Sequence, residues 1–120
     1  MTSKVLLLEQ SEAVTRSIML SLGANGYEVL PAATVEQARK LLETSSIGLV
    51  IADQNILPEE WARLMENYSG SGLFSPVPLI LLTSEEGMLS RETITFAKDW
   101  IIKPFSANRL LKAVNSFTIH

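Results

Sequence analysis

The chain has 120 residues and a mass of 13.2 kDa, with 47% hydrophobic residues, 19% charged residues and a formal net charge of −3 at pH 7. This size and composition predict one folded domain, residues 1–120, and exclude a disordered chain. The sequence contains no cysteine, which excludes disulfides and thiolate metal sites. Because the charge is negative and no Lys/Arg run occurs, we expect no direct nucleic-acid binding. We find neither a signal peptide nor a membrane span, and expect a cytoplasmic protein that does not bind membranes.

Five segments are predicted to be β-strands. Residues 5–8, 49–52 and 79–82 are continuously apolar, which is typical of strands buried on both faces of a parallel sheet. Residues 27–30 and 100–102 have weaker patterns of the same kind. A chain with five such strands and intervening helices favours the α/β class.

The segments between the strands are predicted to be helices. Gly23 and Gly26 end the first, Thr34 and Gln37 form a capping-box pattern at the start of the second, and Ser106 can cap the last. A further helix is predicted over residues 88–97. The other helices are marked by apolar residues at helical spacing: Val14, Ile18 and Leu22; Val35, Ala38, Leu41 and Leu42; Trp61, Leu64, Met65 and Tyr68; Leu110, Leu111, Val114 and Phe117.

Regular alternation of strand and helix predicts a doubly wound, five-stranded parallel sheet with helices on both faces and right-handed crossovers. In such a sheet the ligand binds beyond the carboxyl ends of the strands, at the point where the strand order reverses. The side chains that follow these strands are therefore the candidates for a functional site.

Five polar residues follow or end the predicted strands: Glu9, Gln10, Asp53, Thr83 and Lys103. Each alone has an ordinary explanation, such as a charge at a helix N-terminus for Glu9 or a loop cap for Asp53. Their shared position at one edge of the sheet favours a different explanation. Carboxylate, amide, hydroxyl and ammonium groups together indicate a site that handles an anion with the help of a cation.

Four stretches in this order resemble the signature stretches of the receiver domain of two-component response regulators: "VLLLEQ", "LVIADQN", "PLILLTS" and "WIIKPF". The resemblance covers essentially the whole chain, and "IIKPF" is its most specific part. It implies a flavodoxin-like fold with strand order 2-1-3-4-5. Receivers accept a phosphoryl group on an aspartate from a sensor histidine kinase or a phosphotransfer protein, with Mg²⁺ as cofactor. They are signalling domains rather than enzymes, with at most self-catalysed phosphotransfer and dephosphorylation.

The resemblance assigns roles to individual residues. Asp53 matches the phosphoacceptor, Thr83 the hydroxyl that binds the phosphoryl group, and Lys103 the cation beside it. Trp100 stands where the family has a switch aromatic, usually Tyr or Phe. We predict that Trp100 is largely exposed, because an indole fits the inward position poorly. Receivers also carry the Lys103–Pro104 peptide as cis, in a turn that aims Lys103 inward.

The metal ligands implied by the resemblance are Glu9, Gln10, Asp53 and the backbone carbonyl of Asn55. Receivers normally have two acidic residues at the first pair of positions, and the second of these touches the metal. An amide oxygen can bind a hard cation but brings no charge, so Gln10 predicts weak Mg²⁺ binding. Glu9 is one methylene longer than the usual Asp, and its extra length could let it reach the metal and compensate for the missing charge of Gln10.

These departures leave two hypotheses open. A working receiver signals to a downstream effector domain or protein through the face of its fourth helix, fifth strand and fifth helix, and a homodimer is a further partner compatible with it. A pseudo-receiver is a phosphorylation-independent interaction module; the Glu-Gln pair and the altered loops "QNILPEEWARL" and "TFAKDW" favour it. A flavodoxin-like nucleotide-binding protein is a third alternative, disfavoured because "EQSEAVT" has no glycine to form a phosphate loop.

Overall fold

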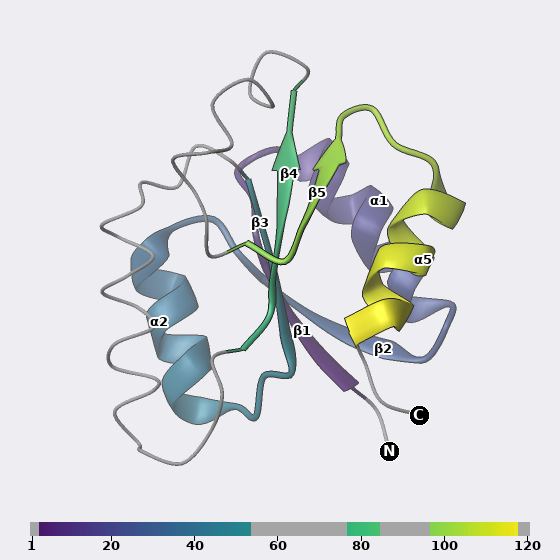
Figure 1. The fold of residues 1–120 in the computed structure, drawn as a ribbon. Helices are drawn as coiled ribbons and strands as arrows, with labels where there is room; N and C mark the ends of the chain where they lie inside the picture. Colours follow the sequence, from purple (N-terminus) through teal and green to yellow (C-terminus); the bar gives the residue numbers. More distant parts are fainter. Residues whose placement is uncertain (1–2, 54–76, 85–96, 118–120) are drawn as a thin grey trace.

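The computed structural model describes residues 3–53, 77–84 and 97–117 (Figure 1). These residues form a five-stranded parallel sheet with helices on both of its faces. The fold is therefore the predicted doubly wound α/β sheet. Its described elements are β1 (Ser3–Leu8), α1 (Glu12–Gly23), β2 (Tyr27–Ala32), α2 (Val35–Thr44), β3 (Leu49–Asp53), β4 (Leu79–Thr83), β5 (Asp99–Ile102) and α5 (Ala107–Phe117).

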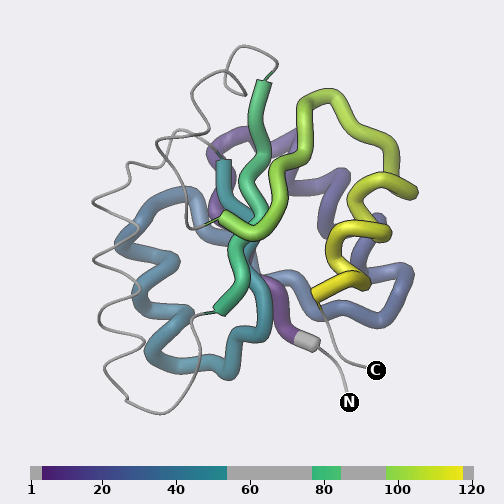
Figure 2. Tube along the Cα trace, in the orientation of Figure 1, coloured from purple at the N-terminus to yellow at the C-terminus, as the bar shows by residue number. Residues whose placement is uncertain are grey.

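The strand order is β2-β1-β3-β4-β5, as the resemblance implied. From β1 the chain runs outward to the edge strand β2, and from β2 it returns past β1 to β3. Because both crossovers are expected to be right-handed, these opposite directions place α1 and α2 on opposite faces of the sheet. Figures 1 and 2 show the two helices on the two sides. The order reverses between β1 and β3, so the carboxyl ends of these two strands form the switch point.

Two apolar clusters fill the space between the sheet and its helices. Successive side chains of a strand point to opposite faces, so Leu6 and Leu8 of β1 pack toward α2, whereas Val5 and Leu7 pack toward α1 and α5. This is why the central strands are apolar at every position. Each fully buried Leu or Ile contributes roughly 1.5–3 kcal/mol, and the result is a rigid sheet that fixes the positions of the strand ends.

The helix caps lie close to where the sequence predicts them. The Thr34 hydroxyl accepts a hydrogen bond from the Gln37 N–H (3.1 Å), and the Ser106 hydroxyl accepts one from the Arg109 N–H (3.0 Å). The Gln37 side chain differs slightly from a capping box. It accepts from the N–H of Ala33 (2.8 Å), one residue before the cap.

Every strand is one or two residues longer than predicted: β1 begins at Ser3, and β3 and β4 end at Asp53 and Thr83. The two edge strands show the same difference. β2 continues through Pro31 to Ala32, where the prediction ended at residue 30. Proline is tolerated here because β2 pairs only with β1 in the described sheet and needs no donor toward its outer side. β5 begins one residue early, at Asp99. The predicted stripe of Trp61, Leu64, Met65 and Tyr68, nearly all of the predicted helix 88–97, and Asn55 lie outside the described residues.

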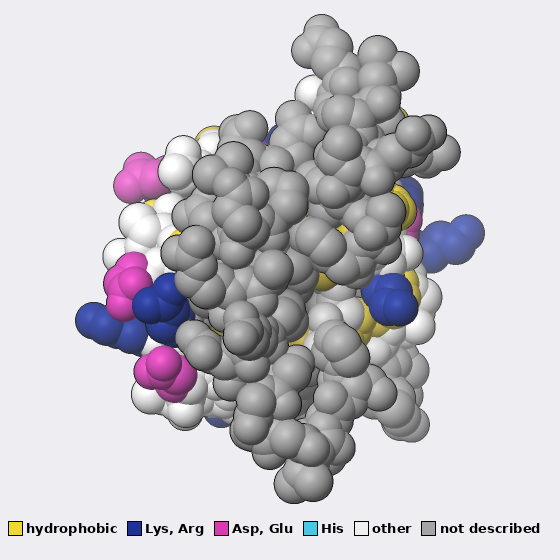
Figure 3. All heavy atoms as spheres, turned by 60° about the vertical axis from the view of Figure 1, so that its left-hand side comes forward, with side chains coloured by type: hydrophobic (Ala, Val, Ile, Leu, Met, Phe, Trp, Pro, Cys, Tyr) yellow, Lys and Arg dark blue, Asp and Glu magenta, His cyan; other side chains and the backbone are white. Residues whose placement is uncertain are grey.

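The surface of α2 carries charges of both signs, including an ion pair between Arg39 and Glu36 (3.3 Å). Figure 3 turns this side of the molecule forward and shows acidic and basic side chains interspersed. In residues 3–53, 77–84 and 97–117, no helix has the length and apolarity that a membrane crossing requires.

Candidate functional site

The sheet register places Glu9 and Asp53 side by side. Leu8 pairs with Ala52 across β1 and β3, so the next residue of each strand, Glu9 and Asp53, occupies the same level at the carboxyl edge. Neighbouring strands are about 4.8 Å apart, which brings the two carboxylates within reach of one shared partner. The prediction that these residues lie at one edge of the sheet is thus met at the switch point.

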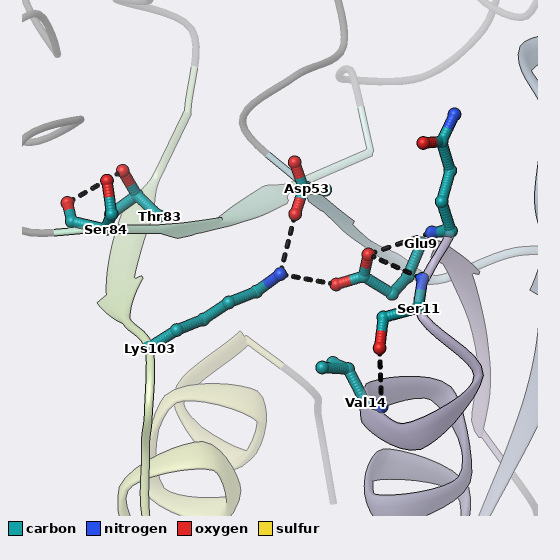
Figure 4. Close-up of polar contacts among 8 residues, drawn as sticks. Glu9, Ser11, Val14, Asp53, Thr83, Ser84 and Lys103 are labelled. Atoms are coloured by element: carbon teal, nitrogen blue, oxygen red, sulfur yellow. Dashed lines mark hydrogen bonds and ion pairs between the residues drawn. The ribbon is translucent and has the colours of Figure 1, made fainter.

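Lys103 supplies that partner. Its ammonium lies 2.6 Å from Glu9 Oε1 and 2.6 Å from Asp53 Oδ2 (Figure 4). Lys103 follows β5, two strands away from β3, or about 10 Å at the usual spacing. Only a long side chain can cross that distance, and Figure 4 shows Lys103 extended toward the two acids. The Lys103–Pro104 peptide that starts the following turn is cis, as predicted.

The second oxygen of Glu9 is engaged as well. Glu9 Oε2 accepts hydrogen bonds from the backbone N–H groups of Gln10 (2.8 Å) and Ser11 (3.2 Å). Ser11 is the N-cap of α1, so this carboxylate also sits at the positive end of the helix dipole. The Glu9 side chain is only 3% exposed. The ordinary explanation of Glu9, a charge at a helix N-terminus, therefore holds together with its ion pair, a combination that the sequence did not reveal.

The environment of Lys103 shifts its pKa. Burial by itself lowers the pKa of the ammonium, but hydrogen bonds and charge attraction from Asp53 and Glu9 outweigh burial and raise the pKa above its ordinary value of 10.5. Lys103 is therefore fully charged at neutral pH. The three side chains, which we call the strand-end cluster, carry a net charge of −1 from two carboxylates and one ammonium.

Thr83 lies at the end of β4 but is turned away from the cluster. Its hydroxyl donates to the carbonyl of Ser84 (3.2 Å), and Figure 4 shows both residues on the far side of Asp53 from Glu9. Thr83 is 2% exposed. The structure thus brings Glu9, Asp53 and Lys103 together, with Thr83 on the neighbouring strand end.

Trp100 is half-buried, so the prediction of a largely exposed side chain is wrong. Side chains alternate along β5: Ile101 faces α1 and α5, while Trp100 packs on the cluster that faces α2. In the sheet register Trp100 lies opposite Leu81, and Ile102 lies opposite Thr83. Trp100 and Thr83 therefore share one face of the sheet on adjacent strands.

A second charged pair, which the sequence did not reveal, lies beside Trp100. Arg109 of α5 is 3.4 Å from Asp99, and its guanidinium donates to the carbonyl of Trp100 (3.0 Å). Arg109 and Trp100, together with Ile102 and Phe105, line a hollow of about 500 Å³. An Asp and an Arg ten residues apart, across a turn, give no recognisable signal in a single sequence.

Gln10 is exposed and lines a groove between α1 and the end of β2. Within the described residues, no cluster of three or more acidic or histidine side chains is positioned to hold a metal ion. The donor set at the cluster still fits a hard cation in kind, because carboxylate and amide oxygens are the ligands that Mg²⁺ accepts. Asp53 and Gln10 are the side chains that can hold one, since both oxygens of Glu9 already accept hydrogen bonds.

Comparison with known proteins places this geometry in context. No family model matches the chain. It is 31% identical to the phosphate regulon transcriptional regulatory protein PhoB of Pseudomonas aeruginosa over 95% of this chain, which covers 52% of that protein. The chain spans about half the length of the first curated relatives it matches, which are regulatory proteins.

Two solved structures share the fold. The chemotaxis response regulator CheY4 of Vibrio cholerae has a TM-score of 0.78 and 25% identity, with 98% of this chain and 100% of that chain covered. The receiver domain of the sensor histidine kinase PA1611 of Pseudomonas aeruginosa has a TM-score of 0.78 and 21% identity, with 98% of each chain covered, and holds a magnesium ion in its active-site cleft.

Proposed function

We propose that this chain, which is a receiver domain of the response-regulator family, accepts a phosphoryl group on Asp53 from a sensor histidine kinase or a phosphotransfer protein. One observation carries the proposal: Asp53 Oδ2 lies 2.6 Å from the Lys103 ammonium at the switch point of the sheet. The Asp53 side chain is 18% exposed, so a donor can approach it from solvent.

The chemistry follows from these groups. A carboxylate oxygen of Asp53 attacks the phosphorus of the donor's phosphohistidine in line, and the bond from phosphorus to the leaving imidazole nitrogen breaks. Negative charge on the transferring oxygens is the main obstacle to this attack. The fixed ammonium of Lys103 is already in place to stabilise that charge. The Thr83 hydroxyl, which now donates to Ser84, has to turn to bind the phosphoryl group.

A magnesium ion, when bound, neutralises charge on the phosphoryl oxygens. In this chain we assign it to Asp53, the amide oxygen of Gln10 and the backbone carbonyl of Asn55, the last outside the described residues. The fold neighbour that holds magnesium supports the choice of cation. We expect weak binding, because Gln10 brings no charge to a cluster that already contains an ammonium.

The output surface that we propose lies around β5 and α5. Thr83 and Trp100 share one face of the sheet, so a movement of Thr83 toward a phosphoryl group can be transmitted to Trp100 through Ile102. The hollow lined by Trp100, Ile102 and Phe105 is the contact site that we assign to a downstream effector domain or protein, or to a second copy of the chain.

Acetyl phosphate, a small phosphodonor, tests the proposal without the cognate kinase. The chain is incubated with acetyl phosphate and MgCl₂, and the intact mass and its sensitivity to hydroxylamine are measured. We expect one acid-stable, hydroxylamine-labile phosphoryl group on the wild type and on Asp99→Asn, and none on Asp53→Asn. Asp99 is the matched control because it is also a partly exposed aspartate paired with a cation. Modification of Asp53→Asn, or none of the wild type, would contradict the proposal.

The alternative is a pseudo-receiver that binds partners without phosphorylation. The observation that favours it is the full engagement of Glu9 by Lys103 and two backbone N–H groups, beside an uncharged Gln10. A wild type that stays unmodified by acetyl phosphate at every Mg²⁺ concentration tested, and that binds its partner equally well as Asp53→Asn, would establish this alternative.

A further inference from the structure

The role of Glu9 is where this chain departs furthest from its family resemblance. The resemblance makes Glu9 a metal ligand whose extra length compensates for Gln10. A carboxylate offers about four lone-pair sites, and the described contacts of Glu9 use three of them. Lys103 takes one on Oε1, and the N–H groups of Gln10 and Ser11 take two on Oε2.

Burial and charge also argue against Glu9 as a metal ligand. The Glu9 side chain is 3% exposed, whereas that of Lys103 is 29% exposed. A divalent cation on Glu9 would meet the Lys103 ammonium at contact distance, and like charges repel strongly where solvent is scarce. The lone-pair site that remains is on Oε1, next to the ammonium, so a cation bound there would have to displace Lys103.

We propose that Glu9 is a positioning residue: it holds the Lys103 ammonium against Asp53 and leaves cation binding to Asp53 and Gln10. The extra methylene is then what lets one carboxylate reach Lys103 on one side and its own following N–H groups on the other. Two of the three tests below, of Mg²⁺ binding and of phosphorylation rate, rest on the proposed function of Asp53. The third test, of stability, rests only on the contacts that the structure shows.

The metal measurement is a calorimetric titration of chelator-treated protein with MgCl₂. We expect Glu9→Gln to change the Mg²⁺ Kd by less than about fivefold, because it removes a nearby charge but no ligand. The matched control is Glu12→Gln, which removes one negative charge from the first turn of α1 and should have a similarly small effect. Lys103→Met should tighten binding by at least about fivefold, because it frees Glu9 Oε1 and removes the repulsion. In the Lys103→Met background, Glu9→Gln should reverse that gain.

A rate measurement separates positioning from a merely structural role. With acetyl phosphate at saturating Mg²⁺, Glu9→Gln should slow phosphorylation of Asp53 about tenfold, because a misplaced ammonium stabilises the transferring oxygens less well. In the Lys103→Met background, Glu9→Gln should not slow phosphorylation any further. A slower rate in both backgrounds would overturn the inference.

The metal-free measurement is a double-mutant cycle by urea unfolding in chelator. Glu9→Gln and Lys103→Met together should shift the midpoint by less than the sum of their separate shifts, because both remove one contact. Additive shifts would overturn the inference, as would a loss of Mg²⁺ affinity of fivefold or more in Glu9→Gln.

If the wild type binds no Mg²⁺, the cation assignment of the proposed function fails, and this cycle alone decides the role of Glu9. If Glu9→Gln does not fold, the Kd of Lys103→Met decides it: unchanged or weaker binding would overturn the inference.

Discussion

Two ion-pair sites of this domain use the same chemistry with different consequences. In the strand-end cluster, Lys103 lies 2.6 Å from both Glu9 and Asp53, and the acidic side chains are 3% and 18% exposed. In the pair between Asp99 and Arg109 the separation is 3.4 Å, with exposures of 32% and 43%. The first site joins the ends of β1, β3 and β5, whereas the second joins β5 to the helix that follows it.

The difference shows that burial and connectivity, rather than the count of charges, decide what an ion pair does. Attraction between charges is strong where water is scarce and is screened at the surface. The strand-end cluster therefore fixes the position of the Asp53 carboxylate, which we propose to be the phosphoacceptor. The pair at α5 is expected to act as a weak surface contact that orients Trp100 through its carbonyl.

The largest effect should come from Lys103→Met, which keeps the length and apolar stem of the side chain. It leaves Glu9 and Asp53 adjacent without a cation. Breaking a buried pair costs about 3–5 kcal/mol, and the partial exposure of Lys103 reduces our expectation to about 2–3 kcal/mol of unfolding free energy. Urea unfolding in chelator measures it. Lys112→Met, on the exposed side of α5, is the control and should cost less than about 0.5 kcal/mol. Equal costs for the two variants would show that the cluster contributes no stability.

The pH dependence of that cost sharpens the comparison. The folded-state pKa of Lys103 is raised above 10.5, so its stabilisation is fully present below pH 10.5 and is lost as the pH rises through the folded-state pKa. The difference in unfolding free energy between wild type and Lys103→Met should therefore be constant from neutral pH to about pH 10 and shrink above 10.5. A difference that persists unchanged well above that pH would mean that packing of the stem, rather than charge, supplies the cost.

An intermediate effect is expected from Gln10→Asp, which adds a carboxylate beside the cluster. One more charged oxygen should tighten Mg²⁺ binding about tenfold, measured by calorimetry at fixed ionic strength. The control is Gln37→Glu, which adds the same charge on the groove shared with Gln10 while keeping an acceptor for the Ala33 N–H. If both variants tighten binding equally, the gain is long-range attraction, and position 10 is not a ligand.

Much of the fold could be predicted from the sequence because burial on both faces leaves a local record. Residues 49–52 and 79–82 are apolar at every position, and such runs are hard to place anywhere but in central parallel strands. The sequence patterns of the edge strands β2 and β5 are weaker, because in the described sheet each of these strands pairs with a neighbour along one edge only. Proline normally ends a predicted strand because it has no N–H to donate, yet β2 continues through Pro31 because it is an edge strand.

The site could be predicted only to the level of which residues share an edge. The positions of Glu9, Asp53 and Lys103 follow from strand ends, but the partner of each oxygen depends on side-chain reach. A Glu at position 9 can bind a cation, cap α1 or hold Lys103, and the pattern of residues is the same in all three cases. The exposure of Trp100 failed to follow from its size, because the face of β5 on which it lies packs against the α2-side cluster.

The smallest effect should come from Arg109→Gln, which tests the surface member of the comparison. The ion pair with Asp99 is long and exposed, so its loss should cost about 0.2–1 kcal/mol of unfolding free energy, and this cost should shrink as salt is added. The Arg109 guanidinium also donates to the Trp100 carbonyl, and its loss should redshift Trp100 fluorescence slightly, measured in a Trp61→Phe background. Arg16→Gln, an exposed arginine of α1, is the control and should leave that emission unchanged. A cost above about 2 kcal/mol would place Arg109 among the structural cations of the domain and remove the distinction between the two sites.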